Sequence, residues 1–355
     1  MTIKHGDAIR QLCDEFISGN TPRFIFGRTR YAHSIAEHFR PDGVIDDFTT
    51  ETLFHGLPVV KLSAVPKNAI VVSAIVDGRP VSVDRTLSNA GIRHIDYFSF
   101  KNNIAVKLEN FAFVDSVDFC ADYERNRKKY DFVFSRLADD ISRETFSRLV
   151  EFRLHEDLRV MDYFKFCPKD SYFESFVPMI SNEAIFIDAG CYDGETTLEF
   201  IRHCPNYRYI HVFEPEPQQM ALIRQKLNGL KNIHYHQCGA SNKKETLAFT
   251  LSGSWSHLDE HGDIVVEVDT IDASVNDEVT FIKMDIEGHE YFALEGARET
   301  IIKNHPVLAI CAYHKVDDFW KLPELIFSFR SDYQLYMRHY TEGVLETVYY
   351  FIPIK

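Results

Sequence analysis

Short apolar segments alternate with helix-length stretches in the C-terminal half of the chain. Five of these segments have the length and apolar character of buried strands. They are Ala184–Asp188, Tyr209–Phe213, Ile233–Cys238, Thr280–Met284 and Val307–Cys311. Two further segments, Tyr333–Arg338 and Thr347–Ile352, are separated only by a short loop that contains Gly343. The pattern predicts a doubly wound α/β sheet that is finished by an antiparallel hairpin.

A smaller α/β pattern occupies residues 1–100. The candidate strands there are Arg23–Gly27, Val44–Asp47 and Ala69–Ile75, and Tyr31–Phe39 has the spacing of a helix. Strand, helix and strand in this order imply parallel pairing with right-handed crossovers. We therefore expect a Rossmann-like N-terminal domain.

Residues 101–180 differ from both flanking regions. The segments ADYERNRKKYDFVFSRLADD and SRETFSRLVEFRLHEDLRVMDYF combine helical spacing with many charges. They predict a helical connector that also packs on the next domain. The expected organisation is therefore an N-terminal domain at 1–100, a connector at 101–180 and a catalytic domain at 181–355, beginning near Ser181.

The composition narrows the class of protein. The chain has 355 residues, of which 45% are hydrophobic, and this length favours two domains. A formal net charge of −14 argues against a protein that tracks nucleic-acid phosphates. The seven cysteines form no Cys-x-x-Cys pair, and the N-terminus lacks an apolar signal core. We expect a cytoplasmic protein with reduced thiols and no transmembrane segment, for which a homo-oligomer stays open.

A glycine-containing loop follows the strand Ala184–Asp188. Gly190 and Gly194 lie in the turn, Asp193 lies between them, and a helix follows. Glycines let backbone approach a ligand closely, and a helix N-terminus offers free N–H donors. The spacing is not the Gly-x-Gly-x-x-Gly of dinucleotide sites. A carboxylate at Asp193 is unfavourable beside a pyrophosphate but suits a cationic sulfonium, so S-adenosylmethionine is the preferred ligand.

A second acid completes this predicted crevice. Glu214 ends the next strand, about 20 residues beyond the loop, where an acid accepts hydrogen bonds from ribose hydroxyls. The alternative is that Glu214 and Pro215 only form a capped turn. Gly239 and Ala240, after the third strand, are expected beside the adenine. The candidate cofactor-binding residues are Asp188, Gly190, Tyr192, Asp193, Gly194, Glu214, Pro215, Gly239 and Ala240.

The chain resembles the FkbM-type methyltransferases from about Asp170 to the C-terminus. The resemblance is carried by FIDAGCYDGETTLEF, VFEPEPQ, FIKMDIEGHEYFALEGA and AICAYHKVDDFWKLPELI, in this order. It implies a class I methyltransferase fold and S-adenosylmethionine as the methyl donor. Many members of the family methylate hydroxyls on sugars, lipid-linked glycans or secondary metabolites, and the acceptor differs between members.

The N-terminal segments FIFGRTRYAHSIAEHF, GVIDD, HGLPVV and AIVVSAI resemble a small Rossmann-like domain at the front of some sugar acyltransferases. Those domains bind nucleotide-linked sugars. Only Gly27 represents the usual glycines here, and Arg28 and Arg30 could meet a phosphate. The alternative is a degenerate domain that serves oligomer contacts.

The candidate catalytic residues follow the fourth and fifth strands. Asp285 and Glu287 come after the fourth strand, and His314 comes after the fifth. The carboxyl ends of neighbouring parallel strands face one crevice. His314 is the candidate base that deprotonates an acceptor hydroxyl, with Asp285 to orient it. A second reading is that Asp285, Glu287 and His314 hold a divalent metal ion, and a third is that the acids only cap a helix.

Further polar residues near these strand ends are candidates for substrate binding. They are His289, Tyr313, Lys315, Arg338 and His339. Tyr172 and Phe173 precede the first strand and could cover the cofactor, although core packing is the favoured role for Phe173.

The sequence therefore predicts an S-adenosylmethionine-dependent O-methyltransferase that acts on a sugar, a glycan precursor or a related small metabolite. A divalent metal is compatible with this reading but not required by it. Two alternatives stay open. One is a nicotinamide-dependent sugar oxidoreductase, against which the missing fingerprint argues, and the other is a non-catalytic protein that binds nucleotide-sugars or acts as a scaffold.

Overall fold

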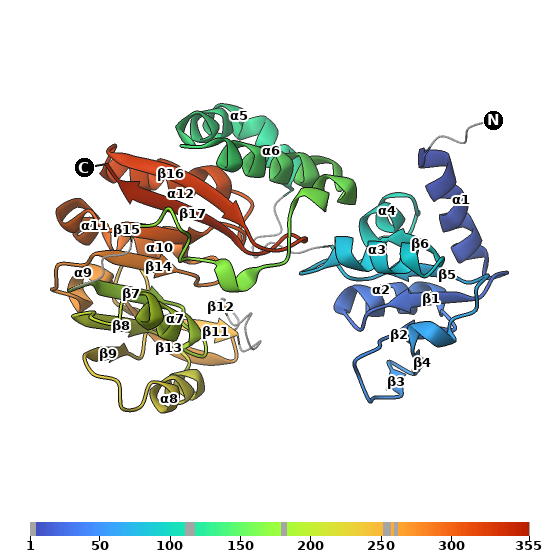
Figure 1. The fold of residues 1–355 in the computed structure, drawn as a ribbon, viewed down its shortest axis with the longest axis horizontal. Coiled ribbons are helices and arrows are strands. Elements are labelled where there is room, and N and C mark those ends of the chain that lie inside the picture. The colour runs from blue at the N-terminus through green and yellow to red at the C-terminus, as the bar shows by residue number, and fades with distance from the viewer. Residues whose placement is uncertain (1–4, 111–117, 179–182, 251–256, 259–261, 355) are drawn as a thin grey trace. The chain divides into compact units, whose positions relative to one another are not determined.

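The computed structural model describes residues 5–110, 118–178, 183–250, 257–258 and 262–354 (Figure 1). The chain divides into two units. The first contains residues 1–112, 147–167 and 340–345, and the second contains residues 113–146, 168–339 and 346–355. The predicted start of the catalytic domain, at Ser181, lies outside the described residues.

The second unit is built on a seven-stranded sheet with the order β16-β17-β15-β14-β7-β8-β9. Its central strands are buried along their whole length, which explains their continuous apolar runs. The first five strands in sequence pair in parallel, and β17 runs antiparallel to both β15 and β16. This arrangement confirms the predicted doubly wound sheet with an antiparallel hairpin. The strands are β7 (Ile185–Ala189), β8 (Tyr209–Phe213), β9 (Ile233–His236), β14 (Phe281–Met284), β15 (Val307–Cys311), β16 (Tyr333–His339) and β17 (Thr347–Pro353).

Helices connect these strands and begin at residues suited to helix starts. Gly194 precedes α7 with a positive φ of 79°, Pro217 opens α8, and the Thr270 side chain caps α9. Trp320 of α12 donates its indole N–H to Asp122 of α5 at 3.0 Å. No helix among the described residues combines the length and apolar character needed to cross a membrane. The helices are α5 (Phe119–Arg136), α7 (Glu195–His203), α8 (Pro217–Lys226), α9 (Ile271–Ser274), α10 (Glu290–Glu295), α11 (Arg298–Asn304) and α12 (Asp318–Phe329), with a 3-10 turn at Pro168–Asp170. The helix α6 (Asp140–His155) begins in this unit, and its residues from 147 onward are assigned to the first.

A second sheet of the same unit lies between β9 and β14 in sequence and was not predicted. Its order is β10-β13-β11-β12, and β11 and β13 pair antiparallel. The segments ETLAFT and IVVEVD alternate between more buried and more exposed positions. Such alternation is typical of strands with one solvated face. The strands are β10 (Gly239–Ala240), β11 (Glu245–Thr250), β12 (His257–Leu258) and β13 (Ile264–Asp269).

The first unit is built on a six-stranded sheet with the order β3-β4-β2-β1-β5-β6. All its strands pair in parallel except β3, which is antiparallel to β4. Phe24, Ile45, Val71 and Leu87 are among the buried residues of its core. Its elements are α1 (His5–Ser18), β1 (Arg23–Phe26), α2 (Arg30–Phe39), β2 (Gly43–Ile45), β3 (Leu53–Phe54), β4 (Leu57–Val60), β5 (Ile70–Ser73), α3 (Pro80–Asn89), β6 (Arg93–Asp96) and α4 (Tyr97–Asn102), with 3-10 turns at Leu62–Ala64 and Leu158–Tyr163.

Candidate active site

The carboxyl ends of β7, β8, β14 and β15 lie side by side at one edge of the second unit's sheet. Asp188 lies in β7 opposite Lys283 of β14, and Glu214 and Asp285 follow β8 and β14 directly. Ligands of doubly wound sheets bind at this edge. The register therefore brings the predicted cofactor loop and the predicted catalytic residues to one edge.

Asp188 is fully buried and is held by two side chains. Lys283 Nζ lies 3.2 Å from Asp188 Oδ1, and Thr197 Oγ1 donates to Oδ2 at 2.7 Å. Lys283 also donates to the carbonyl oxygen of Gly190 at 2.5 Å. Burial alone would lower the pKa of Lys283, but the negative charges of Asp188 and Asp285 outweigh it and raise this pKa. Asp188 therefore anchors the loop through a buried ion pair.

The loop after β7 depends on glycine at Gly190. Its φ is 75°, and a Cβ atom there would lie 1.8 Å from the carbonyl oxygen of Asp285. Asp193 accepts the backbone N–H of Glu195 at 3.1 Å and pairs with Lys226 Nζ at 2.7 Å. Burial raises the pKa of Asp193, but the hydrogen bond from Lys226 outweighs it and leaves this pKa below its ordinary value. The charge of Asp193 is thus paired within the protein.

Glu214 presents a buried carboxylate beside this loop. Its Oε1 accepts the backbone N–H of Glu216 at 3.0 Å. Burial raises the pKa of Glu214 to about 7. A Cβ atom on Gly239 would lie 3.9 Å from Pro215 and 3.2 Å from Val268, so the turn after β9 lies against the turn after β8. The structure thus brings the predicted acid and the predicted small-residue turn together.

Asp285 is oriented by two tyrosines. Tyr172 donates its hydroxyl to Asp285 Oδ2 at 2.9 Å, and Tyr313 donates to Oδ1 at 3.1 Å. The hydroxyl of Tyr350 accepts the backbone N–H of Tyr172 at 2.8 Å. Burial raises the pKa of Asp285, but the positive charges of Lys283 and His314 outweigh it and lower this pKa. Tyr172 therefore positions the carboxylate that the sequence identified.

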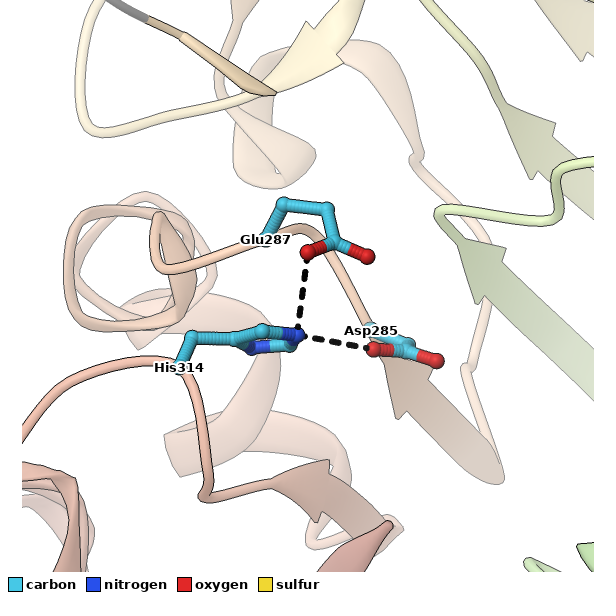
Figure 2. Close-up of side chains that lie close together, drawn as sticks. All are labelled: Asp285, Glu287 and His314. Atoms are coloured by element: carbon cyan, nitrogen blue, oxygen red, sulfur yellow. Dashed lines mark ion pairs between the residues drawn. The ribbon is translucent and has the colours of Figure 1, made fainter. Parts of the chain in front are cut away.

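His314 points between two carboxylates, as Figure 2 shows. Its Nε2 lies 3.5 Å from Asp285 Oδ1 and 3.4 Å from Glu287 Oε2, and its Nδ1 lies 3.0 Å from Glu290 Oε1. Burial lowers the pKa of His314, but Glu290, Glu287 and Asp285 outweigh it and raise this pKa to about 10. Burial and the charge of Asp285 raise the pKa of Glu287 to about 8. Near neutral pH the imidazole is therefore a cation within the acids.

Three further acids of this cluster were not selected from the sequence. Glu290 is fully buried and accepts the backbone N–H of Ile286 at 2.9 Å. Burial and the charge of Glu290 raise the pKa of Asp318 to about 7, and burial and the charge of Asp285 raise the pKa of Glu346 to about 7. Lys283 was also missed. A lysine inside the apolar strand FIKM indicates a buried charge, which requires a partner of opposite charge.

The predicted substrate residues His289 and Lys315 have other contacts in this structure. His289 Nε2 lies 3.0 Å from Ser241 Oγ, and burial lowers the pKa of His289 to about 4. Lys315 Nζ lies 5.9 Å from the ring centre of Phe292. His289 therefore contacts the turn after Gly239 and Ala240 as a neutral imidazole.

Arg338 and His339 contact residues of the C-terminal hairpin and of the segment between α5 and α6. Arg338 pairs with Asp139 at 2.7 Å, and its guanidinium lies 4.6 Å from the ring centre of Phe176. His339 Nδ1 lies 2.8 Å from Thr347 Oγ1. These contacts can hold the hairpin, and substrate binding by either residue stays a prediction.

In the first unit, the predicted phosphate contacts are also paired. Gly27 has a φ of 95°, as a tight turn after β1 requires. Arg28 Nε lies 2.9 Å from Asp46, and Arg30 donates to the Tyr31 hydroxyl at 2.9 Å. Binding of a nucleotide-sugar in this unit stays a prediction.

Two overlapping groups of side chains in the described part of the chain have the composition of a metal site. One group is Asp285, Glu287 and His314, and the other is Glu290, His314 and Asp318. In each group the candidate ligand atoms lie within 4.8 Å of one another. The first group is partly exposed and the second is buried. Only the first can therefore hold an ion and still meet a substrate.

Comparison with known proteins supports the family resemblance and the fold. Residues 188–341 match the model of the methyltransferase FkbM domain. The crystal structure of methyltransferase FkbM from Methylobacillus flagellatus KT is similar, with 26% identity, coverage of 97% of this chain and 93% of that chain, and a TM-score of 0.74. This match supports the predicted class I methyltransferase fold.

More distant structural matches cover about half of the chain. An rRNA methylase from Streptococcus thermophilus has 16% identity, coverage of 50% of this chain and 90% of that chain, and a TM-score of 0.35. A precorrin-6y C5,15-methyltransferase from Geobacter metallireducens GS-15 has 15% identity, coverage of 48% and 80%, and a TM-score of 0.31. A search of curated proteins gives no significant match.

Proposed function

Since residues 188–341 match the model of the methyltransferase FkbM domain, we propose that this protein transfers a methyl group from S-adenosylmethionine to a hydroxyl of a sugar, a glycan precursor or a related metabolite. One observation carries the proposal. The anchored loop at Gly190, the buried carboxylate of Glu214 and the Asp285–His314 pair follow neighbouring strands of one sheet edge. The choice of a sugar hydroxyl rests on the family resemblance.

The residues at this edge suit a cationic adenosyl donor. The carboxylate of Glu214 is buried, and its described contacts include no cationic side chain within hydrogen-bond distance. Ribose hydroxyls could therefore donate to it. The helix α7 begins at Gly194 and presents N–H groups to the loop. Gly239 and Ala240 would border the adenine. An acidic edge of this kind favours a sulfonium over a pyrophosphate.

The donor would supply a methyl carbon that is bonded to sulfur. The acceptor oxygen would bond to this carbon while the carbon–sulfur bond breaks and leaves its electron pair on sulfur. The hydroxyl proton would pass to a base. The protein has to hold the hydroxyl in line and ease the loss of its proton. Asp285 is fixed for the first task by Tyr172 and Tyr313. With a pKa of about 10, His314 serves as a base only when another positive charge displaces its proton.

Titration calorimetry with S-adenosylmethionine and with NAD⁺ tests the proposal. We expect the first to bind and NAD⁺ not to bind. Glu214→Ala should weaken donor binding by about 10–100-fold, because hydrogen bonds to a charged group are lost. The matched control is Glu324→Gln, which neutralises an exposed acid of α12. Tighter binding of NAD⁺, or unchanged affinity in Glu214→Ala, would refute the assignment. Transfer of a labelled methyl group to a panel of glycosides then tests the acceptor.

A further inference from the structure

The imidazole of His314 is buried, and neither of its ring nitrogens makes a hydrogen bond of acceptable geometry to a described residue. The residue is 3% exposed, and Nε2 is the nitrogen that points toward the partly exposed acids. It lies 3.5 Å from Asp285 Oδ1 and 3.4 Å from Glu287 Oε2. Buried polar atoms normally have a partner. The imidazole nitrogen and the two carboxylate oxygens face a common point without a hydrogen bond between them. This is the arrangement expected of ligands around a bound ion.

The other nitrogen of His314 also fits this interpretation. Nδ1 lies 3.0 Å from Glu290 Oε1, and Glu290 is fully buried. A metal-binding histidine usually directs its second nitrogen to a carboxylate or carbonyl, which fixes the ring and its tautomer. Glu290 also accepts the backbone N–H of Ile286, so its orientation is fixed by the segment that carries Asp285 and Glu287. The two carboxylate ligands and the residue that supports His314 therefore belong to one short stretch of chain, residues 285–290.

The charges around His314 leave room for a further cation. Asp285, Glu287 and Glu290 lie within ion-pair distance of its ring, and Asp318 and Glu346 interact with the same group. Buried charges require compensation. A divalent ion among these carboxyl groups would provide it.

We propose that Asp285, Glu287 and His314 bind a divalent metal ion, with Glu290 as the residue that positions His314. The candidate ligand atoms are His314 Nε2 and the two carboxylate oxygens nearest to it, Asp285 Oδ1 at 3.5 Å and Glu287 Oε2 at 3.4 Å (Figure 2). Two hard oxygens and one imidazole suit a first-row ion such as Mn²⁺.

The exposure of these ligands explains how such an ion could serve the reaction. The side chains of Asp285 and Glu287 are 22% and 19% exposed, whereas His314 is buried behind them. Three protein ligands on one side leave coordination positions open on the other. A hydroxyl placed there would have its pKa lowered by the ion and would lose its proton to water more readily. The role in methyl transfer rests on the proposed function, but ion binding does not.

Binding is tested first on the wild-type protein with Mn²⁺ as the probe. The electron paramagnetic resonance signal of free Mn²⁺ should fall by one equivalent per chain, and pulsed measurements on the bound ion should show coupling to an imidazole nitrogen. This test needs no variant. Absence of binding at millimolar Mn²⁺, or bound Mn²⁺ without nitrogen coupling, overturns the proposal.

Variants then assign the ligands. Glu287→Gln and His314→Ala should each weaken Mn²⁺ binding at least tenfold. Glu290→Gln should weaken it by about 10–100-fold, as expected for a residue that orients a ligand. Glu324→Gln is the matched control and should not change it. Retention of wild-type Mn²⁺ affinity in both ligand variants overturns the assignment.

The failure of this inference can be told apart from failure of the proposed function. Affinity for S-adenosylmethionine is measured separately in the presence of a chelator. If Mn²⁺ does not bind while the donor binds and the methyl group is transferred in the presence of the chelator, the metal inference is wrong and the proposed function stands. If Mn²⁺ binds with nitrogen coupling and the donor does not bind, the metal site stands and the proposed function is wrong.

Discussion

Replacing Lys283 by Met is expected to destabilise the second unit strongly. Lys283 is 1% exposed, its Nζ lies 3.2 Å from Asp188, and it donates to the carbonyl oxygen of Gly190 at 2.5 Å. Methionine has a similar length and fills similar space. The substitution therefore removes the charge with little loss of packing and leaves Asp188 buried beside Thr197 alone.

The magnitude follows from the geometry. At 3.2 Å and an effective dielectric constant of about 20, two unit charges attract by about 5 kcal/mol. Desolvation of both ions offsets most of this, so the pair as a whole is worth little. Removing one partner costs about 3–5 kcal/mol, because the other charge stays buried without compensation. The double variant Lys283→Met/Asp188→Asn has no unpaired ion and should lose only about 1–2 kcal/mol, mainly from hydrogen bonds.

Urea unfolding followed by tryptophan fluorescence measures this difference. Of the two tryptophans, Trp320 lies in α12 of the second unit, so its fluorescence reports on that unit. Lys243→Met is the control, because Lys243 is 66% exposed and pairs with Glu245 at the surface. It should change the free energy of unfolding by less than about 1 kcal/mol. A double variant that is as unstable as Lys283→Met, or a loss below about 1 kcal/mol in Lys283→Met, would refute the reasoning.

Three further changes have defined outcomes. Gly190→Ala should cost about 3 kcal/mol in thermal unfolding and abolish donor binding in calorimetry, because a Cβ atom would lie 1.8 Å from the Asp285 carbonyl oxygen at a φ of 75°. Because the pKa of Glu214 is about 7 and the proposed ribose contact would need its ionised form as acceptor, donor affinity should rise with pH between about 6 and 8. Calorimetry on Glu214→Gln should show this rise removed, and a rise of equal size there would contradict the assignment. Arg338→Met should lower the free energy of unfolding by about 2 kcal/mol, because the ion pair with Asp139 is lost. KM for the acceptor should stay unchanged. A large change in KM would instead favour substrate binding by Arg338.

The main sheet could be predicted because its strands are buried on both faces. A run such as Val307–Cys311 is apolar throughout, and a helix-length stretch precedes it, so both strand and connection are visible in the pattern. The strands β11 and β13 were missed because each has one solvated face and carries charges within it, such as Glu267. They pair mainly with each other, and the other partner of β11 is the two-residue strand β12, which is too short to show a pattern.

The candidate site could be predicted only in part, since residue type and strand position identify acids but not their partners. Glu214 and Asp285 stand out because they end apolar strands. The pairing of Asp193 with Lys226 of α8 joins residues 33 positions apart, and no local pattern indicates it. The same holds for Glu290 and His314, which lie 3.0 Å apart where α10 packs against α12, the helix that follows His314. Such pairings matter for the function of the site, because they determine which carboxylates remain available to bind a ligand.

One structural link joins the cofactor loop to the catalytic residues. The backbone N–H of Asp285 donates to the carbonyl oxygen of Ala189 at 3.1 Å, and Gly190 packs directly on the carbonyl of Asp285. Lys283, opposite Asp188 in register, bonds the next carbonyl of the same loop. A shift of β14 by one residue would turn Lys283 to the other face of the sheet and break all three contacts. Donor binding and the position of Asp285 therefore depend on the same strand register, so substitutions at Lys283 should impair both together.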